Sequence, residues 1–109
     1  MKKVYVIQPM NGLSDDEIKA ERAKAKAYAE IYLGEEVELI ESFFEGEDGT
    51  SVGMLGRGIS MMGDADLVVI MPYRWGQNRG CSCEEYVVES YDLPYLRIST
   101  EIPVHAEEG

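Results

Sequence analysis

The sequence predicts an α/β protein with three layers, in which a doubly wound parallel sheet of about four strands lies between helices. Short apolar segments alternate along the chain with longer segments of helical pattern, which is the order expected for β-α-β-α-β-α-β. Residues 67–71 are apolar at every position, as in a central parallel strand that is covered on both faces. With right-handed crossovers, this order favours the strand order 2-1-3-4.

The first half of the chain supplies two expected strands and one long helix. Residues 3–9, KVYVIQP, are rich in β-branched and aromatic residues and predict a buried strand that includes Tyr5 in its core. Ser14 and Glu17 have the spacing of a capping box, which predicts a helix over residues 15–33. Small and apolar residues at helical spacing predict the face that packs on the sheet: Ala20, Ala23, Ala27 and Ile31. Residues 37–40 predict the second strand.

The second half supplies two more helices and two more strands. Ser51 is expected to cap a helix whose apolar positions are Val52, Leu55, Ile59 and Met62. Its glycines either weaken it or permit close contact with a partner helix or ligand: Gly53, Gly56 and Gly58. Residues 67–71 and 95–98 predict strands. Residues 81–91 predict a third helix with Cys83, Val87 and Tyr91 in register, and residues 99–109 a polar tail.

The length of 109 residues fits one domain, covering residues 1–109, that can form a hydrophobic core without a disulfide or a metal. No run of eighteen apolar residues is present, so we expect no transmembrane helix and no membrane partner. The N-terminal segment resembles a strand more than a signal peptide, and we therefore expect a cytoplasmic location.

The net charge of −11 argues against a nucleic acid polymer as the partner, because binding to a polyanion relies on clustered Lys and Arg. It leaves room for a small nucleoside or a single phosphate. Cys81 and Cys83 are too close in sequence for an unstrained disulfide. With one His in the chain they do not supply four zinc ligands, so we expect no metal. We expect no organic cofactor either.

The expected ligand-binding edge lies beyond the carboxyl ends of the strands, where the first and third strands are neighbours. The loops placed there are residues 8–14 and 72–80. A P-loop motif is absent from the sequence, and so is a glycine fingerprint of the dinucleotide-binding type after the first strand. The one histidine, His105, lies in the tail, which disfavours a Ser/His/Asp set.

Acidic and polar residues near the third helix form the candidate site, in the spacing W-x-x-N-x-G-x-x-x-E from Trp75 to Glu84. Glu84 is expected in the first turn of the helix, where the dipole favours an ionised carboxylate. Such a carboxylate in a pocket can be a nucleophile toward a sugar carbon, but acids also occur in first turns simply because they suit the dipole. Glu85 competes for this role, and only one of the two can face the pocket.

Three segments, VYVIQPMNGL, ADLVVIMP and WGQNRGCSCEE, resemble the nucleoside 2-deoxyribosyltransferase superfamily, in particular its small bacterial and phage branch. The resemblance spans about residues 3–98 and implies a Rossmann-like or flavodoxin-like fold. It also implies cleavage or transfer of the N-glycosidic bond of a (deoxy)nucleoside or nucleotide, by hydrolysis or transfer to another base. Glu84 then matches the family's nucleophile, which attacks C1′ to give a covalent sugar–enzyme intermediate.

The same resemblance assigns roles to other positions. Asp66 matches an Asp that acts around the base or its protonation. Asn78 stands where the family has Asp or Ser; it can still hydrogen-bond to the sugar but carries no charge, which departs from the transferases. Gly80 belongs to the turn before the nucleophile. The family's assemblies also imply a homodimer or a larger homo-oligomer.

Further candidate substrate-binding residues lie in the two loops. Gln8 and Asn11 can hydrogen-bond a ligand and Gly12 permits close backbone approach, or the three form only a turn and a helix cap. Trp75 either stacks on a base or covers the end of the sheet.

Two alternatives to an enzyme stay open. One is a non-catalytic module of the same fold that binds a nucleotide or ribose phosphate, which Asn78 favours. The other is an interaction protein that uses Phe43, Phe44 and Trp75 as an oligomer surface.

Overall fold

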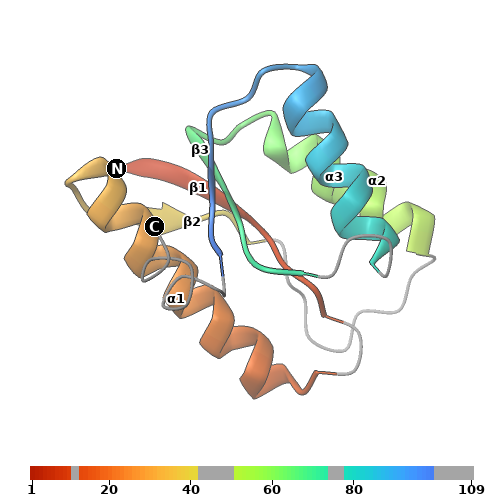
Figure 1. The fold of residues 1–109 in the computed structure, drawn as a ribbon, viewed down its shortest axis with the longest axis horizontal. Helices are drawn as coiled ribbons and strands as arrows, with labels where there is room; N and C mark the ends of the chain where they lie inside the picture. Colours follow the sequence, from red (N-terminus) through yellow and green to blue (C-terminus); the bar gives the residue numbers. More distant parts are fainter. Residues whose placement is uncertain (11–12, 42–50, 74–77, 100–109) are drawn as a thin grey trace, which may run out of the picture.

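The computed structural model describes residues 1–10, 13–41, 51–73 and 78–99, and contains a four-stranded parallel sheet (Figure 1). The strands are β1 (Lys2–Ile7), β2 (Val37–Leu39), β3 (Leu67–Ile70) and β4 (Tyr95–Arg97). Their order is β2-β1-β3-β4, and all three pairings are parallel. The predicted order 2-1-3-4 is therefore confirmed.

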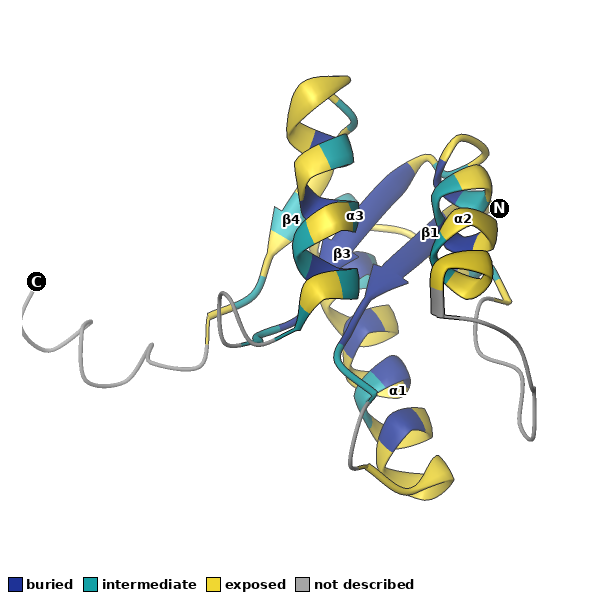
Figure 2. Cartoon of the chain, turned by 90° about the vertical axis from the view of Figure 1, so that its right-hand side faces the viewer, coloured by how far each residue is buried: buried dark blue, intermediate teal, exposed yellow. Residues whose placement is uncertain are grey.

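Helices cover both faces of this sheet. They are α1 (Asp15–Leu33), α2 (Ser51–Met62) and α3 (Arg79–Ser90). The helix α1 lies on one face, and α2 and α3 lie together on the other, so that the sheet is the middle of three layers (Figures 1 and 2). The predicted α/β fold class is confirmed.

The core is divided by the alternation of side chains along β1 and β3. Val4 and Val6 pack with Ala25 and Ala29 of α1, whereas Tyr5 and Ile7 belong to a second cluster on the side of α2 and α3. Successive residues of a strand point to opposite faces, so each strand contributes to both clusters. Side chains at even-numbered positions of β1 therefore face α1, and those at odd-numbered positions face α2 and α3.

The buried face of α1 differs from the predicted one. The buried residues are Ile18, Arg22, Ala25 and Ala29, whereas Ala20, Ala23, Ala27 and Ile31 are exposed. The sequence contains two sets of residues at helical spacing that could form the buried face. The set that is buried includes an arginine, Arg22, among apolar residues. Arg22 is accommodated because its guanidinium donates a hydrogen bond of 2.9 Å to the carbonyl oxygen of Ile40.

The ends of α1 follow the local sequence. The Ser14 hydroxyl accepts from the backbone N–H of Glu17 at 3.1 Å, and the Glu17 carboxylate accepts from the backbone N–H of Ser14 at 2.8 Å. This confirms the capping box. At the other end, Gly34 adopts the left-handed conformation with φ of 73°, which a glycine accepts without strain.

The helix α3 begins two residues earlier than predicted. Asn78 is its N-cap, and the Asn78 side-chain oxygen accepts from the backbone N–H of Cys81 at 2.9 Å. The earlier start goes with a different buried face: Cys81, Glu85 and Val88. Of the predicted face, Val87 is half-buried, and Cys83 and Tyr91 are exposed.

The helix α2 begins at Ser51, the residue predicted to cap it. Met62 is buried and Leu55 and Ile59 are half-buried, as the pattern indicated, but Val52 is 79% exposed. The predicted tail, apart from Ser99, and the Phe43–Phe44 pair lie outside the described residues.

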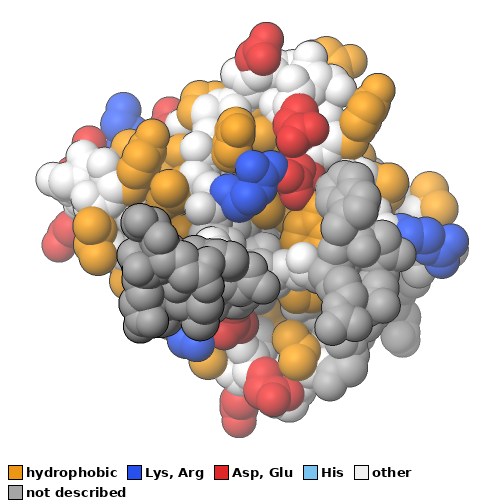
Figure 3. All heavy atoms as spheres, in the orientation of Figure 1, with side chains coloured by type: hydrophobic (Ala, Val, Ile, Leu, Met, Phe, Trp, Pro, Cys, Tyr) orange, Lys and Arg blue, Asp and Glu red, His pale blue; other side chains and the backbone are white. Residues whose placement is uncertain are grey.

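The surface of the described residues shows no continuous basic patch on the face in Figure 3, where Lys and Arg side chains lie apart from each other. Within the described ranges, no helix is both long enough and apolar enough to cross a membrane.

Candidate active site

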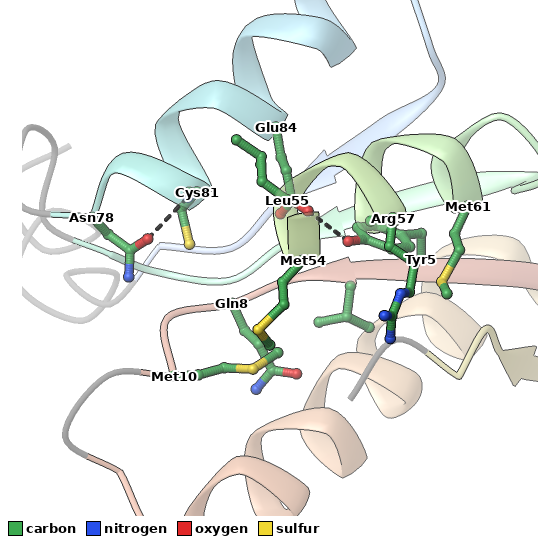
Figure 4. A pocket seen from close by; sticks show the side chains of 13 residues that line it. Tyr5, Gln8, Met10, Met54, Leu55, Arg57, Met61, Asn78, Cys81 and Glu84 are labelled. Atoms are coloured by element: carbon green, nitrogen blue, oxygen red, sulfur yellow. Dashed lines mark hydrogen bonds between the residues drawn. The ribbon is translucent and has the colours of Figure 1, made fainter. Parts of the chain in front are cut away.

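A pocket of about 240 Å³ opens between the carboxyl end of β1 and the helices α2 and α3 (Figure 4). This is the edge at which ligands bind in parallel sheets of this type. From β1 and the segment after it, the lining residues are Tyr5, Val6, Gln8 and Met10. From α2 they are Met54, Leu55, Arg57, Gly58 and Met61, and from the N-terminal part of α3 they are Asn78, Gly80, Cys81 and Glu84.

The centre of this pocket is a hydrogen bond between β1 and α3. The Tyr5 hydroxyl donates to Oε2 of Glu84 at 2.6 Å (Figure 4). Tyr5 is 3% exposed, as predicted for a core residue, but its hydroxyl reaches the site, which the sequence analysis missed. The sequence does contain a signal for this role. Tyr5 and Ile7 point to the same face of the sheet, and a buried tyrosine hydroxyl usually has a hydrogen-bond partner.

The electrostatic environment of Glu84 is that of a carboxyl group removed from water. Burial raises the pKa of Glu84 from its ordinary 4.5 to about 7, and the hydrogen bond from Tyr5 acts in the opposite direction. Near neutral pH the carboxyl group therefore exists in both protonation states. A strongly shifted pKa in a pocket marks a candidate functional residue.

The groups around Glu84 stay protonated. Burial, and then the nearby Glu84 charge, raise the pKa of Tyr5 well above its ordinary value, so the hydroxyl remains a donor. The same two causes raise the pKa of the Cys81 thiol to about 12. Cys81 is therefore an inert thiol in the pocket wall, because thiolate is the reactive form.

Gly58 allows α2 to lie directly against this pair. A Cβ atom at Gly58 would lie 2.4 Å from the Tyr5 hydroxyl oxygen and 2.5 Å from Oε2 of Glu84. A side chain there would force the Tyr5 hydroxyl and the Glu84 carboxylate to shift, so this glycine gives the close contact that the sequence left as one alternative. At Gly56 an added Cβ would meet no atom within 4 Å.

The neighbouring acid, Glu85, faces away from the pocket. Its side chain is buried, accepts from the Tyr73 hydroxyl at 2.5 Å and forms an ion pair with Arg97 of β4. Arg97 also reaches Glu89 and lies over the ring of Tyr95, 5.3 Å from its centre. Only Glu84 of the two lines the pocket.

Glu84 does not lie in the first turn of α3, because that helix starts at Arg79 and no acid occupies its first turn. The predicted support from the helix dipole is therefore weaker than expected, since the dipole acts mainly within the terminal turn. Gly80 lines the pocket from inside the first turn instead of from a turn before the helix. Asn78 lines the pocket as well, although its side-chain oxygen caps the helix.

The structure separates Asp66 from the other candidates. Asp66 precedes β3 at the amino end of that strand, where its carboxylate accepts from the Lys3 backbone N–H at 2.7 Å. Its own N–H donates to the Lys3 carbonyl oxygen at 2.7 Å, and it does not line the pocket. The predicted residues Asn11, Gly12 and Trp75 lie outside the described residues.

Gln8 does line the pocket and is 5% exposed. The side chains that α2 contributes to the pocket were not predicted: Arg57, Met54 and Met61. In the part of the chain that the structure describes, no three His, Cys, Asp or Glu side chains gather in a way that could hold a metal ion.

Comparison with known proteins shows the fold of the chain. No family model matches the chain, and no curated protein matches it. A solved structure of a 2-desoxiribosyltransferase from Leishmania mexicana is similar, with a TM-score of 0.63 and 19% sequence identity. The match covers 92% of this chain and 65% of the other one, so this chain spans less than two thirds of that protein.

Proposed function

We propose that the protein cleaves or transfers the N-glycosidic bond of a (deoxy)nucleoside or nucleotide, with Glu84 as the nucleophile. The observation that carries this proposal is the Glu84 carboxyl group, which lines a pocket and is held at one oxygen by Tyr5. The spacing of the sequence around Glu84 and the similarity of the fold to a deoxyribosyltransferase support the same chemistry.

The proposed reaction starts with ionised Glu84. Tyr5 holds Oε2, and Oε1 takes no hydrogen bond from any described residue, which leaves Oε1 to attack the sugar. A bond forms between Oε1 and C1′ while the bond from C1′ to the base nitrogen breaks, and the departing base takes a proton from water. Water or a second base then attacks C1′, loses a proton to the hydroxide ion that the first step left, and releases the Glu84 carboxylate.

The rest of the pocket suits such a ligand. Met10, Met54, Leu55 and Met61 give it an apolar wall against which a flat base can pack. Because the Asn78 oxygen caps α3, its amide N–H₂ group is the end that can donate to the ligand. Asp66 has no part in this proposal, because it lies at the amino end of β3.

The test is a substrate panel. Wild type and Glu84→Gln are incubated with 2′-deoxynucleosides and their 5′-monophosphates, with and without a second free base, and released or exchanged bases are separated by chromatography. Wild type is expected to release or exchange base, and Glu84→Gln to be slower by more than about 10³-fold, as for other covalent nucleophiles.

A covalent intermediate gives a second measurement. Acid-quenched wild type should carry the mass of a deoxyribosyl group on the peptide that contains Glu84. Glu89→Gln, on an exposed part of α3, is the control and should retain turnover and the adduct. Absence of base release from every substrate, or undiminished turnover by Glu84→Gln, would refute the proposal.

A second candidate is a non-catalytic module of the same fold that binds a nucleotide or ribose phosphate. It is favoured by Asn78, an uncharged residue whose side-chain oxygen is engaged in capping its own helix. This candidate predicts that nucleotides raise the melting temperature without any base release. Turnover that depends on Glu84 separates the two functions.

The homo-oligomer implied by the family resemblance is also a proposal. Light scattering of the purified protein at several concentrations tests it, and a monomer at all of them would refute it.

A further inference from the structure

The side chain of Gln8 has one satisfied end and one unsatisfied end. Gln8 follows β1 and is 5% exposed. Its Nε2 donates to the carbonyl oxygen of Ile18 in α1 at 3.3 Å. Because a carbonyl oxygen only accepts hydrogen bonds, this contact fixes which end of the amide faces α1. The other end, Oε1, is buried and takes no hydrogen bond from any described residue.

Such an atom is unusual in a folded protein. Nearly all buried polar side-chain atoms have a hydrogen-bond partner, and each exception calls for an explanation. An apolar side chain would fit the local environment, because Met10 and Met54 line the same pocket. A buried acceptor that lacks a partner among the described residues, in a residue of the pocket wall, indicates that the partner arrives with the ligand.

We infer that Oε1 of Gln8 determines ligand specificity by accepting a hydrogen bond from a hydroxyl or amino group of the nucleoside. This inference rests on the proposed function, because it places the nucleoside in the pocket that contains Glu84. The group on the ligand must be a neutral donor. A phosphate oxygen is an acceptor at neutral pH and would be repelled by Oε1 at this point.

Access to Oε1 requires a small movement, because the atom is buried in the unliganded protein. Met10 and Met54 can provide it (Figure 4). Methionine is unbranched and has three rotatable side-chain bonds, so its thioether adapts to an entering ligand. Displacement of a thioether by a ligand would expose the acceptor and bring the donor to it in one step.

The expected selectivity follows from the buried acceptor. A site built to bond a hydroxyl or N–H group rejects an analogue that lacks this group, since the acceptor is then left unpaired. For a single neutral hydrogen bond, we expect the analogue to bind about 10- to 100-fold more weakly.

The experiment measures binding by calorimetry to the Glu84→Gln protein, so that no turnover disturbs it. The ligands are 2′-deoxyadenosine, 2′-deoxycytidine, 2′-deoxyguanosine and thymidine. The best of these is then compared with its analogues that lack the 3′-hydroxyl, the 5′-hydroxyl or an N–H donor of the base. The three analogues distinguish a sugar hydroxyl from a base amino group as the donor.

The protein variant is Gln8→Met, which keeps the length of the side chain and removes the acceptor. In the Glu84→Gln protein with Gln8 intact, one analogue should bind about 10- to 100-fold more weakly than its parent. When Gln8→Met is added, the same analogue and its parent should bind with affinities within about threefold of each other. Without ligand, Gln8→Met should melt at the same or a higher temperature, because it buries no unpaired acceptor.

Three results would overturn the inference: equal binding of all analogues to the Gln8 protein, unchanged discrimination in Gln8→Met, or no binding of any nucleoside. The first does not depend on whether the variant folds. Base release by wild type together with unchanged discrimination would refute this inference and leave the proposed function standing. Discrimination that depends on Gln8, without base release, would support this inference, refute the proposed glycosidic reaction and favour the binding module.

Discussion

Glu84 and Glu85 are neighbours on α3 and both carboxyl groups are enclosed by the protein, but their partners differ in charge. Glu84 is bonded by the neutral hydroxyl of Tyr5, whereas Glu85 is bonded by Tyr73 and paired with the guanidinium of Arg97. The negative charge of Glu85 is thus balanced, and the residue connects α3 to β4. Among the described residues Glu84 has no such cation, and burial raises its pKa to about 7. Whether an enclosed carboxylate is structural or chemically poised depends here on its partner.

Glu84→Gln should produce the largest effects, and they should have opposite signs. Turnover is expected to fall by more than about 10³-fold, because the proposed nucleophile is lost. Stability at pH 8 should rise, because ionised Glu84 is unfavourable in the fold. The shift from 4.5 to about 7 corresponds to an upper limit of about 3 kcal/mol in the free energy of unfolding.

The pH dependence fixes the sign of this effect. Because the folded pKa lies above the unfolded one, the contribution of Glu84 to stability is complete below about pH 4.5 and is lost as pH rises through about 7. Denaturant unfolding at pH 5 and pH 8 should show this loss in wild type and not in Glu84→Gln. Comparing the two proteins cancels the effect of their large shared net charge, and equal pH dependence would show that Glu84 is solvated.

Glu85→Gln tests the other half of the comparison and should lower stability. The substitution keeps an acceptor for Tyr73 but leaves Arg97 without its buried partner. We expect a loss of about 1–3 kcal/mol in the free energy of unfolding, less than for a fully buried pair because Arg97 can turn toward water and Glu89. Turnover should stay within about tenfold of wild type. A loss of turnover as large as that of Glu84→Gln would break the distinction between the two acids.

Gly58→Ala tests whether the close approach of α2 creates the environment of Glu84. Since the added methyl group would overlap the Tyr5 hydroxyl and the Glu84 carboxylate, we expect a loss of about 1–3 kcal/mol and at least about tenfold lower turnover. Gly56→Ala in the same helix is the matched control. It should be neutral or stabilise the protein by up to about 1 kcal/mol. Thermal unfolding and steady-state rates measure both, and similar results for the two variants would contradict the overlap.

Of these substitutions, Tyr5→Phe should change turnover least, but it should shift the pH–rate profile in a defined direction. The hydroxyl stabilises ionised Glu84, so its removal should raise the pKa of Glu84 further. The acid limb of the pH–rate profile should then move to higher pH, with a rate at neutral pH that is lower by up to about tenfold. A limb that moves to lower pH would show that Tyr5 does not donate to the ionised carboxylate.

The fold was predictable because its determinants are local patterns. Alternating apolar and helical segments gave the strand order, and Ser14 with Glu17 gave the start of α1 from four adjacent residues. The buried face of α1 was not predictable in the same way. Arg22 is buried because a carbonyl oxygen of a distant strand end receives it, and spacing along the helix carries no information about that partner.

The candidate site shows the same division. Glu84 was preferred to Glu85 as the pocket acid because of its spacing to Gly80 and the family resemblance, but its predicted place in the first turn of α3 was wrong. Its partner Tyr5 is 79 residues away in sequence and was not predicted. The role of Gly58 depends on the distance between a helix and a hydrogen bond formed by two other elements. Asp66 was assigned to the site from its position in a motif. It precedes β3 and therefore lies at the amino end of that strand, whereas the pocket lies at the carboxyl ends.

The bond between Tyr5 and Glu84 also has a consequence for the order of folding. Each turn of α3 can form locally, but this contact forms only after β1, β3 and α3 have come together, because it closes a loop of 79 residues. During refolding, the helical signal should therefore recover before the titration of Glu84 near neutral pH does. The protonation state of the Glu84 carboxyl group would then report when α3 packs against the sheet during refolding.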